Sequence, residues 1–367
     1  MTISMFDTFI SPKAAEYVGR VLDSTYVSEG TKVREFEEKL TSTLGWINPV
    51  AVNSGTSALH LALVLAGIEP GDEVICPAQT FVATGLVILQ QRATPVFADI
   101  QYATGNLDPT SIEKKITKKT KAILPVHWGG SPCDMDEIGT IAAEYNLAVV
   151  EDAAHATGAT YKGSPIGSIS QFTCFSFQAI KHITTGDGGA VCCLDKSDAK
   201  KALAKRWFNI DRAHSLPSIL GERQYDIPSP GYKYHMNDYA AALGLANLEG
   251  FEERLLRRRK IASCYRKAFE DMDGIQLFES SAHRESAEWI FGMHVQRRED
   301  FIRALQSRNV TASVVHLRID HNSCFGGKNK DLPNQDQFNE TQINLPLHDG
   351  LTATNVLAVI DAVKAGW

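Results

Sequence analysis

The chain has 367 residues, a formal net charge of −6 and a charged fraction of 22%. This length allows one large domain and a smaller one, and the acidic balance excludes a nucleic-acid binder with a broad basic face. No run approaches the roughly 18 uninterrupted apolar residues of a membrane helix, and the N-terminus lacks the pattern of a signal peptide. Seven cysteines without a CxxC pair predict a reducing, cytoplasmic location and no zinc site.

From about residue 50, short apolar runs alternate with helical patterns. The runs predicted as strands include DEVICP (72–77), TPVFADI (94–100), KAILPVHW (121–128) and LAVVEDAA (147–154). Helices are predicted in TSALHLALVLAG (56–67), at 81–91, after Asp108 with its following proline, and in DMDEIGTIAAEY (134–145). Strands separated by helices of this length predict an α/β fold with a mostly parallel sheet covered on both faces.

The pattern changes after about Asn237. One long helical stretch is predicted over 236–272, then strands near 289–296 and 312–315 and helices at 299–308 and 354–364. We therefore expect a large domain over 1–250 and a smaller α+β domain over 251–367. The basic run RLLRRRK (254–260) is interpreted as a solvated helix face.

The stretch NSGTSALHLAL joins a strand to a helix through Gly55, Thr56 and Ser57. A helix N-terminus at this point presents free backbone N–H groups, which suit a phosphate. The alternative is simple capping of the helix by Thr56 or Ser57. The stretch contains neither GxxxxGK nor GxGxxG, so the sequence does not favour a nucleotide or dinucleotide loop here.

Two further stretches place polar residues after predicted strands, where open parallel sheets bind ligands. VVEDAAHATGA offers Glu151, Asp152 and His155, and FSFQAIKHITTGDGGAV offers Ser176 and Lys181. Taken singly, an acid can cap a helix, a histidine can be structural and a lysine can decorate a turn. Together, a phosphate-binding helix end, an acid and a lysine beside a hydroxyl are what pyridoxal phosphate (PLP) requires.

The chain resembles the PLP-dependent nucleotide-sugar aminotransferases of the DegT/StrS group, which have the fold type I of aspartate aminotransferase. The likeness covers nearly the whole chain, from EGTKVREFEEKL to INLPLHDGL. It is carried by the motifs NSGTSALHLAL, PAQTFVAT, PVHWGG, EDAAHATGA, FSFQAIKHITTGDGGAV and GYKYHMNDYAAALGL. The resemblance implies a three-layer α/β/α large domain.

By this resemblance, Lys181 is the catalytic lysine that forms a Schiff base with the cofactor. Asp152 pairs with the pyridine nitrogen of PLP, and Gly55, Thr56 and Ser176 contact its phosphate. The dehydratases of the group carry histidine in place of the lysine, so Lys181 speaks against that activity. No metal is implied.

The same resemblance assigns three more cofactor contacts. Phe81 stacks on the PLP ring, and His155 lies near the ring hydroxyl, where many relatives have glutamine. Lys233 stands in GYKYHM where many relatives have an asparagine that reaches the phosphate of the neighbouring subunit. A lysine ammonium suits a phosphate dianion, and other relatives have lysine here, so we expect a homodimer with active sites shared between subunits.

The activity implied is transfer of an amino group from L-glutamate to a keto sugar for amino-sugar and surface-polysaccharide biosynthesis. The turn TTGDGG favours a nucleotide-linked 4-keto-6-deoxy hexose, whereas the departure at VVHLRIDHNSCFGG leaves other acceptors open. His316 and Arg318 in that segment either meet a diphosphate or carboxylate or support the small domain. The competing interpretations are a PLP-binding regulator and a dinucleotide-binding oxidoreductase.

Overall fold

The computed structural model describes residues 2–212 and 215–367, and its centre is a seven-stranded sheet with the order β1-β9-β8-β5-β4-β2-β3. Only β9 runs antiparallel to its neighbours, so the prediction of a mostly parallel sheet is confirmed. The strands are β1 (Pro49–Val52), β2 (Glu73–Pro77), β3 (Thr94–Ala98), β4 (Thr120–Ile123), β5 (Ala148–Asp152), β8 (Phe172–Ser176) and β9 (Gly189–Cys193).

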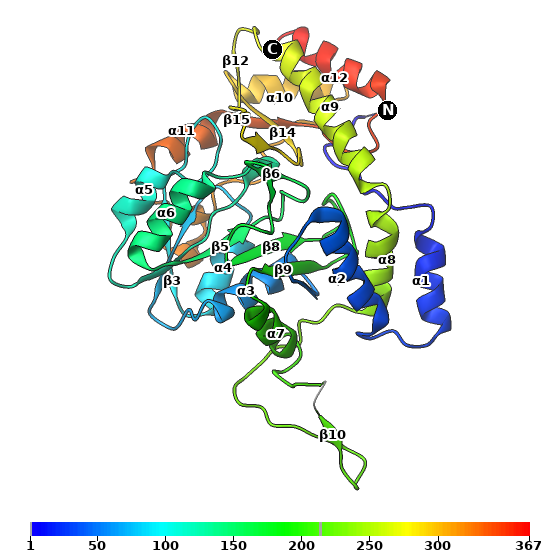
Figure 1. Ribbon diagram of the computed structural model, residues 1–367. Helices are drawn as coiled ribbons and strands as arrows, with labels where there is room; N and C mark the ends of the chain where they lie inside the picture. Colours follow the sequence, from blue (N-terminus) through cyan, green and yellow to red (C-terminus); the bar gives the residue numbers. More distant parts are fainter. Residues whose placement is uncertain (1, 213–214) are drawn as a thin grey trace.

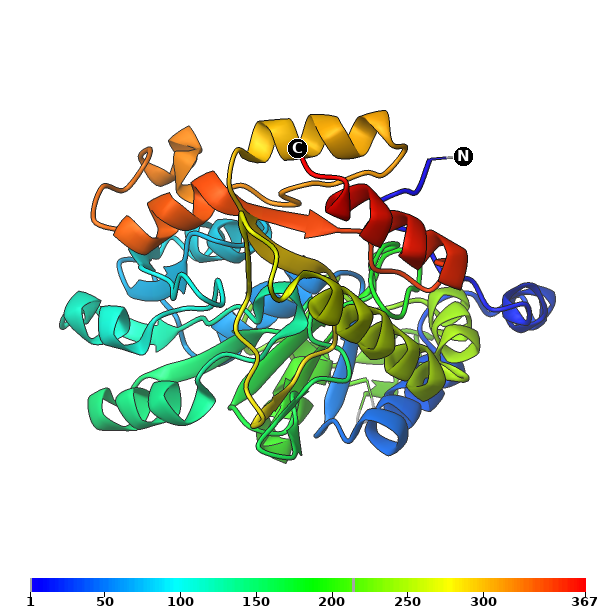
Figure 2. The ribbon, with the colours of Figure 1, turned by 90° about the horizontal axis from the view of Figure 1, so that it is seen from above.

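Helices cover both faces of this sheet, as Figures 1 and 2 show. Val74 and Cys76 of β2 pack into one apolar cluster and Ile75 into the other, as the alternation of side chains along a strand requires. The helices α2 (Thr31–Leu44), α6 (Met135–Tyr145) and α8 (Asp238–Leu248) contribute to the cluster that contains Ile75. The opposite cluster includes α3 (Gly55–Leu65), α4 (Ala83–Gln90) and α7 (Lys196–Lys205). The remaining helices of this part are α1 (Ala14–Asp23) and α5 (Pro109–Lys115).

The C-terminal elements gather on one side of the central sheet (Figure 1). A three-stranded antiparallel sheet has the order β12-β14-β15 and packs with α9, α10 and α12 around a separate apolar cluster. The elements are α9 (Phe251–Phe269), β12 (Ile275–Leu277), β14 (Phe291–Val295), α10 (Arg298–Ser307), α11 (Pro333–Thr341), β15 (Gln342–Leu345) and α12 (Ala353–Lys364).

Short elements connect and extend these two parts. β13 (Arg284–Glu285) pairs with β6 (Thr160–Tyr161), which also pairs with β7 (Ser164–Pro165). The three short 3₁₀ turns are η1 (Trp128–Gly130), η2 (Ile319–His321) and η3 (Ser323–Phe325). The pair β10 (Leu216–Pro217) and β11 (Arg223–Gln224) forms a hairpin that extends from the body of the molecule. Within the described ranges, no helix combines the length and apolar character needed to cross a bilayer.

The long helical stretch predicted over 236–272 is wrong in one respect, because it is two helices. α8 ends before Glu249 and α9 begins at Phe251, with Gly250 between them at a φ of 65°. That left-handed conformation is cheap for glycine and interrupts an α-helix.

The interpretation of 254–260 as a solvated helix face is also wrong. Arg258 is 4% exposed and donates from Nη1 to the carbonyl of Leu347 at 3.0 Å and from Nε to Asp349 at 3.0 Å. Arg259 donates to the carbonyls of Ser286 and Gly158, both at 2.9 Å. The arginines of α9 therefore connect distant loops by hydrogen bonds to carbonyls, a role for which the forked guanidinium is suited.

The strand predicted at 312–315 does not form. Ser313 makes only an isolated bridge with Asn344, and Val315 has a φ of 60°, which no extended strand contains. The chain instead turns sharply at Val315.

Candidate active site

A cavity of about 360 Å³ lies at the carboxyl ends of the parallel strands β5 and β8. Seven of the eight residues expected to bind the cofactor line this cavity, although they come from four separate stretches of the chain. These residues are Gly55, Thr56, Phe81, Asp152, His155, Ser176 and Lys181. The structure therefore brings together residues up to 126 positions apart in sequence, from Gly55 to Lys181.

The N-terminus of α3 forms one end of the cavity. Ser54 caps the helix, because its Oγ accepts a hydrogen bond from the Ser57 backbone N–H at 3.0 Å. The cap is thus neither Thr56 nor Ser57, and the N–H groups of Gly55 and Thr56 have no acceptor among the described residues. A Cβ on Gly55 would lie 2.9 Å from the Cβ of Ser176, so only glycine leaves this end open. Free N–H groups at the positive end of a helix are suited to bind a phosphate.

Asp152, the last residue of β5, is 6% exposed. Its Oδ2 accepts a hydrogen bond from Thr84 Oγ1 at 2.7 Å, and its Oδ1 accepts one from the Ala154 N–H at 3.2 Å. Burial raises the pKa of Asp152, and the two hydrogen bonds oppose that shift by stabilising the carboxylate. A cationic group in the cavity would complete its set of partners.

Glu151 faces away from this cavity. Its Oε2 lies 2.7 Å from His127 Nε2, and its Oε1 accepts a hydrogen bond from Thr173 Oγ1 at 2.9 Å. Both side chains of this pair are fully buried, so Glu151 is a structural residue and Asp152 is the acid at the ligand edge.

Lys181 follows β8 and lines the cavity together with Asp152. Burial lowers the pKa of Lys181 to about 7, and attraction to the Asp152 carboxylate only partly opposes this shift. The Nζ atom lies 3.7 Å from the centroid of the Trp289 ring, and among the described residues no carboxylate is within ion-pair distance of it. An amine with a pKa near 7 is available as a free base at neutral pH, as a nucleophile requires.

His155 and Phe81 present an unpaired ring nitrogen and an exposed aromatic ring, which a flat ligand could contact. The buried Nδ1 of His155 has no hydrogen-bond partner, and the imidazole stacks on Trp289 with centroids 3.7 Å apart. Burial and nearby positive charge hold the pKa of His155 well below its usual range, so the ring is neutral. Phe81 is 52% exposed and lines the cavity.

Lys233 lies outside the cavity. It is exposed, its Nζ lies 4.6 Å from the centroid of the Trp207 ring, and its backbone forms an isolated bridge with Trp207. Within one chain, therefore, Lys233 does not join the other seven residues.

Two residues of the segment VVHLRIDHNSCFGG have different positions. His316 lines the cavity, whereas Arg318 is 1% exposed and binds Asp320 through two hydrogen bonds of 2.7 and 2.6 Å. Arg318 also contacts Asp336 and the carbonyl of Asn329. Of the two alternatives for Arg318, the structure favours the supporting role, because its guanidinium is already bound within the protein.

The sequence did not reveal Trp289, which supports both His155 and Lys181. It is fully buried, and its Nε1 donates to the carbonyl of Ile180 at 3.0 Å. Nothing in the local pattern around Trp289 distinguishes it from an ordinary core tryptophan, because its partners lie more than 100 positions away.

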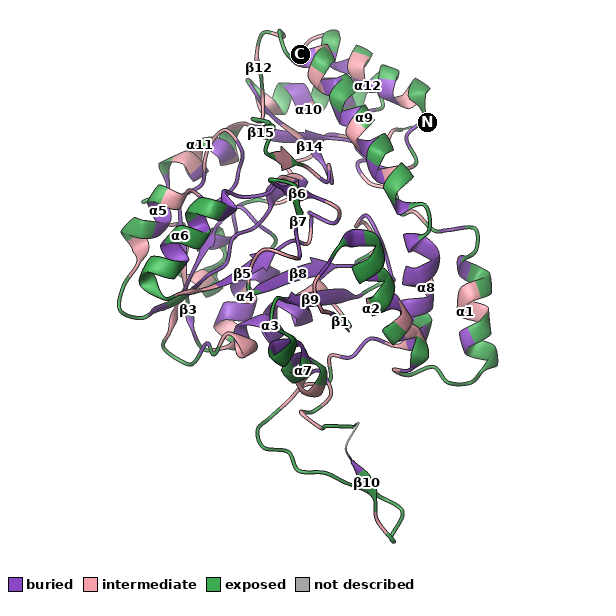
Figure 3. Cartoon of the chain, in the orientation of Figure 1, coloured by how far each residue is buried: buried purple, intermediate pink, exposed green. Residues whose placement is uncertain are grey.

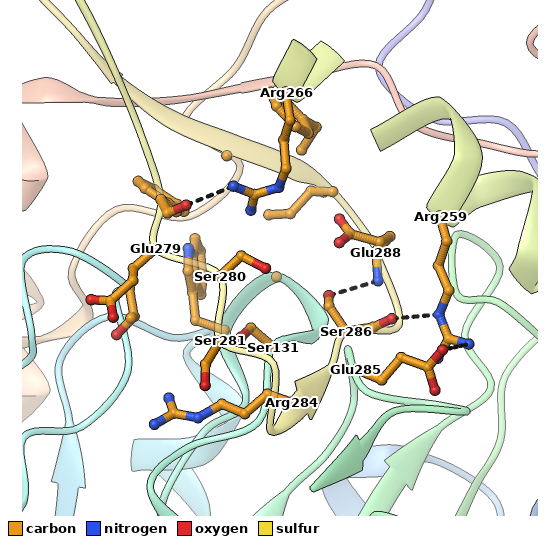
Figure 4. Close-up of a pocket in the computed structure, with 17 residues that line it drawn as sticks. Ser131, Arg259, Arg266, Glu279, Ser280, Ser281, Arg284, Glu285, Ser286 and Glu288 are labelled. Atoms are coloured by element: carbon orange, nitrogen blue, oxygen red, sulfur yellow. Dashed lines mark hydrogen bonds and ion pairs between the residues drawn. The ribbon is translucent and has the colours of Figure 1, made fainter. Parts of the chain in front are cut away.

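A second hollow of about 250 Å³ lies near η1 and α9 (Figure 4). Arg266 donates to the carbonyl of Phe278 at 2.8 Å, and Arg259 pairs with Glu285 at 2.8 Å. These arginines are engaged in holding loops together, and no lysine or histidine lines the hollow. The arrangement of reactive groups thus favours the cavity of Lys181.

Comparison with known proteins decides the family. The model of the DegT/DnrJ/EryC1/StrS aminotransferase family matches residues 9–364. The chain belongs to this family. Within it, the spore coat polysaccharide biosynthesis protein SpsC of Bacillus subtilis (strain 168) is 38% identical over 97% of this chain and 94% of its own. The GDP-perosamine synthase of Escherichia coli O157:H7 is 33% identical over 99% of this chain and 98% of its own.

Solved structures of sugar aminotransferases share the fold. CalS13 from Micromonospora echinospora superimposes with a TM-score of 0.94 at 35% identity, with each chain covered in full. Spr1654 from Streptococcus pneumoniae, described as a putative sugar aminotransferase, was solved in a PLP-form with a TM-score of 0.91, 30% identity and coverage of 100% and 98%. The predicted fold type I of aminotransferases is thus confirmed, and the protein is an aminotransferase.

Proposed function

We propose that this protein moves an amino group from L-glutamate to the keto group of a nucleotide-linked sugar, with PLP as cofactor and Lys181 as catalytic base. The observation that carries the proposal is the cavity of Lys181. It combines an amine with a pKa near 7, a buried carboxylate and an open helix N-terminus at one edge of the sheet. Family membership supplies the reaction class.

The residues present fit PLP. The N–H groups of Gly55 and Thr56, with the Ser176 hydroxyl, would hold its phosphate. Asp152 would pair with the ring nitrogen, since a buried carboxylate whose pKa is raised by burial gains most from a cationic partner. Phe81 would cover one face of the ring, and the unpartnered Nδ1 of His155 would reach a ring oxygen.

When bound, PLP supplies an aldehyde that captures amines and a conjugated ring that accepts electrons. The proton transfers then belong to Lys181. Its Nζ removes the proton from the donor Cα in the first half-reaction and delivers a proton to the sugar carbon in the second. A base with a pKa near the working pH performs both transfers efficiently.

The acceptor we propose is a nucleotide-linked 4-keto-6-deoxy hexose, and the product is an amino sugar for a surface polysaccharide. The names of two relatives that match nearly the whole chain support this class of acceptor and product. They are a GDP-perosamine synthase and a spore coat polysaccharide biosynthesis protein. The turn TTGDGG, which follows Lys181, is the sequence feature that favours amination at C4.

We further propose that the active unit is a homodimer in which Lys233 completes the partner subunit's phosphate site. Support comes from the exposed position of Lys233 outside its own cavity and from the hairpin of residues 215–228 that precedes it. On this hairpin Ile219 and Leu220 are 102% and 84% exposed, and Figure 3 shows its predominantly exposed surface. Apolar side chains in such a position are typical of an interface. The seven free thiols support the cytoplasmic location that we propose.

The test is spectroscopic. Purified protein with PLP is expected to absorb visible light, and addition of L-glutamate is expected to remove that absorption as the amine is transferred. Addition of a 4-keto-6-deoxy hexose linked to GDP, dTDP or UDP should restore it. A coloured protein that does not respond to glutamate would favour the PLP-binding regulator, and a colourless protein that binds a dinucleotide would favour the oxidoreductase.

A further inference from the structure

The second hollow, near η1 and α9, contains two opposite charges that do not pair with each other. Arg266 and Glu288 both line it, and among the described residues that Figure 4 draws no ion pair joins them. Arg266 donates one hydrogen bond, from Nη1 to the carbonyl of Phe278 at 2.8 Å. A guanidinium has five N–H donors, so most of the donors of Arg266 remain open to a ligand.

Glu288 has an unusual backbone conformation at this position. Its φ is 49°, in the left-handed region that residues other than glycine seldom adopt, and its N–H donates to the Ser286 hydroxyl at 3.0 Å. Burial raises the pKa of Glu288, although the charges of Arg266 and Arg259 and a hydrogen bond from Ser286 oppose this shift. Backbone strain beside a carboxylate with a perturbed pKa is typical of a ligand site.

Two buried donors of the hollow also lack an acceptor. Trp128 is 1% exposed, and its indole Nε1 has no hydrogen-bond partner among the described residues. The Nε of Arg284 is likewise unpartnered there, although the same guanidinium pairs with Asp134 through Nη2. Buried donors of this kind are satisfied by an oxygen atom of a ligand or of water.

The volume and the apolar part of the wall define the ligand further. At about 30 Å³ for each water-sized group, a hollow of about 250 Å³ accommodates about eight non-hydrogen atoms. Phe278, Ile290 and Phe291 add apolar surface to its wall. A carboxylate on Arg266 and an ammonium group on Glu288 would pair both charges, which an anion or a cation alone would not do. A free α-amino acid with a short aliphatic side chain has this size and this pair of charges.

We propose that this hollow binds a free aliphatic α-amino acid, with its carboxylate on Arg266 and its ammonium group on Glu288. The inference goes beyond the proposed function, because such an amino acid is neither the donor nor the acceptor in that reaction. Glu288 and Ile290 flank Trp289, whose ring centroid lies 3.7 Å from the amine of Lys181. A ligand in the hollow thus contacts residues on both sides of the ring that supports Lys181.

Equilibrium dialysis with radiolabelled L-leucine and L-valine tests the binding without any variant. The protein is loaded with PLP and reduced with borohydride, so that no aldehyde remains to capture an amine. We expect saturable binding of one equivalent for each chain. Isoamylamine lacks the carboxylate and isocaproate lacks the ammonium group, so each should compete at least tenfold more weakly than L-leucine. Absence of saturable binding, or competition by either analogue as strong as that of L-leucine, would overturn the proposal.

Two variants with matched controls locate the site. E288Q removes a charge with little change in volume and R266M removes the guanidinium, so each should weaken the binding of L-leucine at least tenfold. The controls are E299Q and R303M, because Glu299 and Arg303 form an exposed pair at 3.1 Å on α10. Both controls should bind as the wild type does. W128F keeps an aromatic ring without the N–H and should weaken binding about fivefold.

The outcomes separate this inference from the proposed function. Wild-type affinity in both E288Q and R266M, or an equal loss in the two controls, would overturn the amino-acid site even if glutamate and a keto sugar react as proposed. Failure of those reactions would overturn the proposed function and leave the dialysis result intact. Melting temperatures identify any variant that unfolds, and the competition by the two analogues then decides, because it uses wild-type protein.

Discussion

The cavity around Lys181 and the hairpin of residues 215–228 differ in how far the surrounding chain encloses their side chains. The cavity is enclosed by residues from many elements, and its acid and amine are held by hydrogen bonds and ring contacts. The hairpin has a two-pair ladder and carries Ile219 and Leu220 in solvent. Seven of the eight expected cofactor residues line the first region within one chain, whereas the second region exposes its apolar side chains. The groups that carry the proposed chemistry thus come from one chain, and the homodimer that we propose would cover the apolar side chains of the hairpin.

Removing the amine should give the largest effect. K181A is expected to lower turnover at least 10³-fold, because both the covalent attachment of the cofactor and the proton transfers are lost. PLP should still bind non-covalently through the α3 terminus and Asp152. K181R is the control, since it keeps a positive charge but offers no free base. Turnover in K181A within tenfold of wild type would show that the cavity is not the catalytic site.

Mixing K181A, which is expected to be inactive, with K233A, which is expected to bind PLP weakly, tests the role proposed for the second copy. K233A should weaken PLP binding about 10- to 100-fold, the loss expected for a charge-assisted hydrogen bond. In a mixed dimer of K181A and K233A subunits, one of the two sites has both lysines intact. Activity at low PLP should therefore reappear when the subunits are exchanged. If K233A binds PLP normally, or if the mixture stays inactive after exchange, the sites are not shared.

The amine of Lys181 should also lower the free energy of unfolding of the cofactor-free protein. The pKa of Lys181 falls from 10.5 to about 7 on folding, so the unfolded chain binds more protons between these values and stability rises with pH across this window. We expect K181M to raise the free energy of unfolding by about 1–2 kcal/mol at pH 6, a value discounted for the partial exposure of the side chain. The gain should shrink as pH approaches 10.5. Urea unfolding at pH 6 and pH 10 measures this difference, and an equal effect at both values would contradict the shift.

The smallest effect is expected at the phosphate end of the cavity. G55A places a Cβ 2.9 Å from the Cβ of Ser176, so one of the two must move. We expect PLP binding to weaken about fivefold, or about 1 kcal/mol, by equilibrium titration. G139A is the matched control, because Gly139 lies in α6 with open space around it. Its substitution should leave PLP affinity unchanged and should slightly stabilise the helix.

Much of the cavity of Lys181 could be predicted from the sequence, because its polar residues directly follow apolar runs that are recognisable as strands. Asp152 follows an apolar run and Lys181 follows another, and parallel strands bring such positions to one edge. The family motifs then assign a role to each residue, and those roles stay predictions until the experiments above are done.

The remainder depends on contacts that no local pattern encodes. Trp289 supports Lys181 across more than 100 positions, and the turn at Val315 is held by two buried glutamines from distant segments. From the sequence, the arginines of α9 resemble a solvated helix face, because the loops whose carbonyls they bind lie far away in the chain. A strand pattern at 312–315 was overridden by the same long-range hydrogen bonds. The division at residue 250 between the large and small parts stays a prediction.

The central claim is that one amine, Lys181, carries the cofactor. Reduction of the PLP-loaded protein with borohydride, followed by peptide mapping, tests it most directly. We predict that the trapped cofactor is found on the peptide that contains Lys181, in one equivalent for each chain. Attachment to another lysine such as Lys233, or no attachment in a protein that is coloured and folded, would contradict the account.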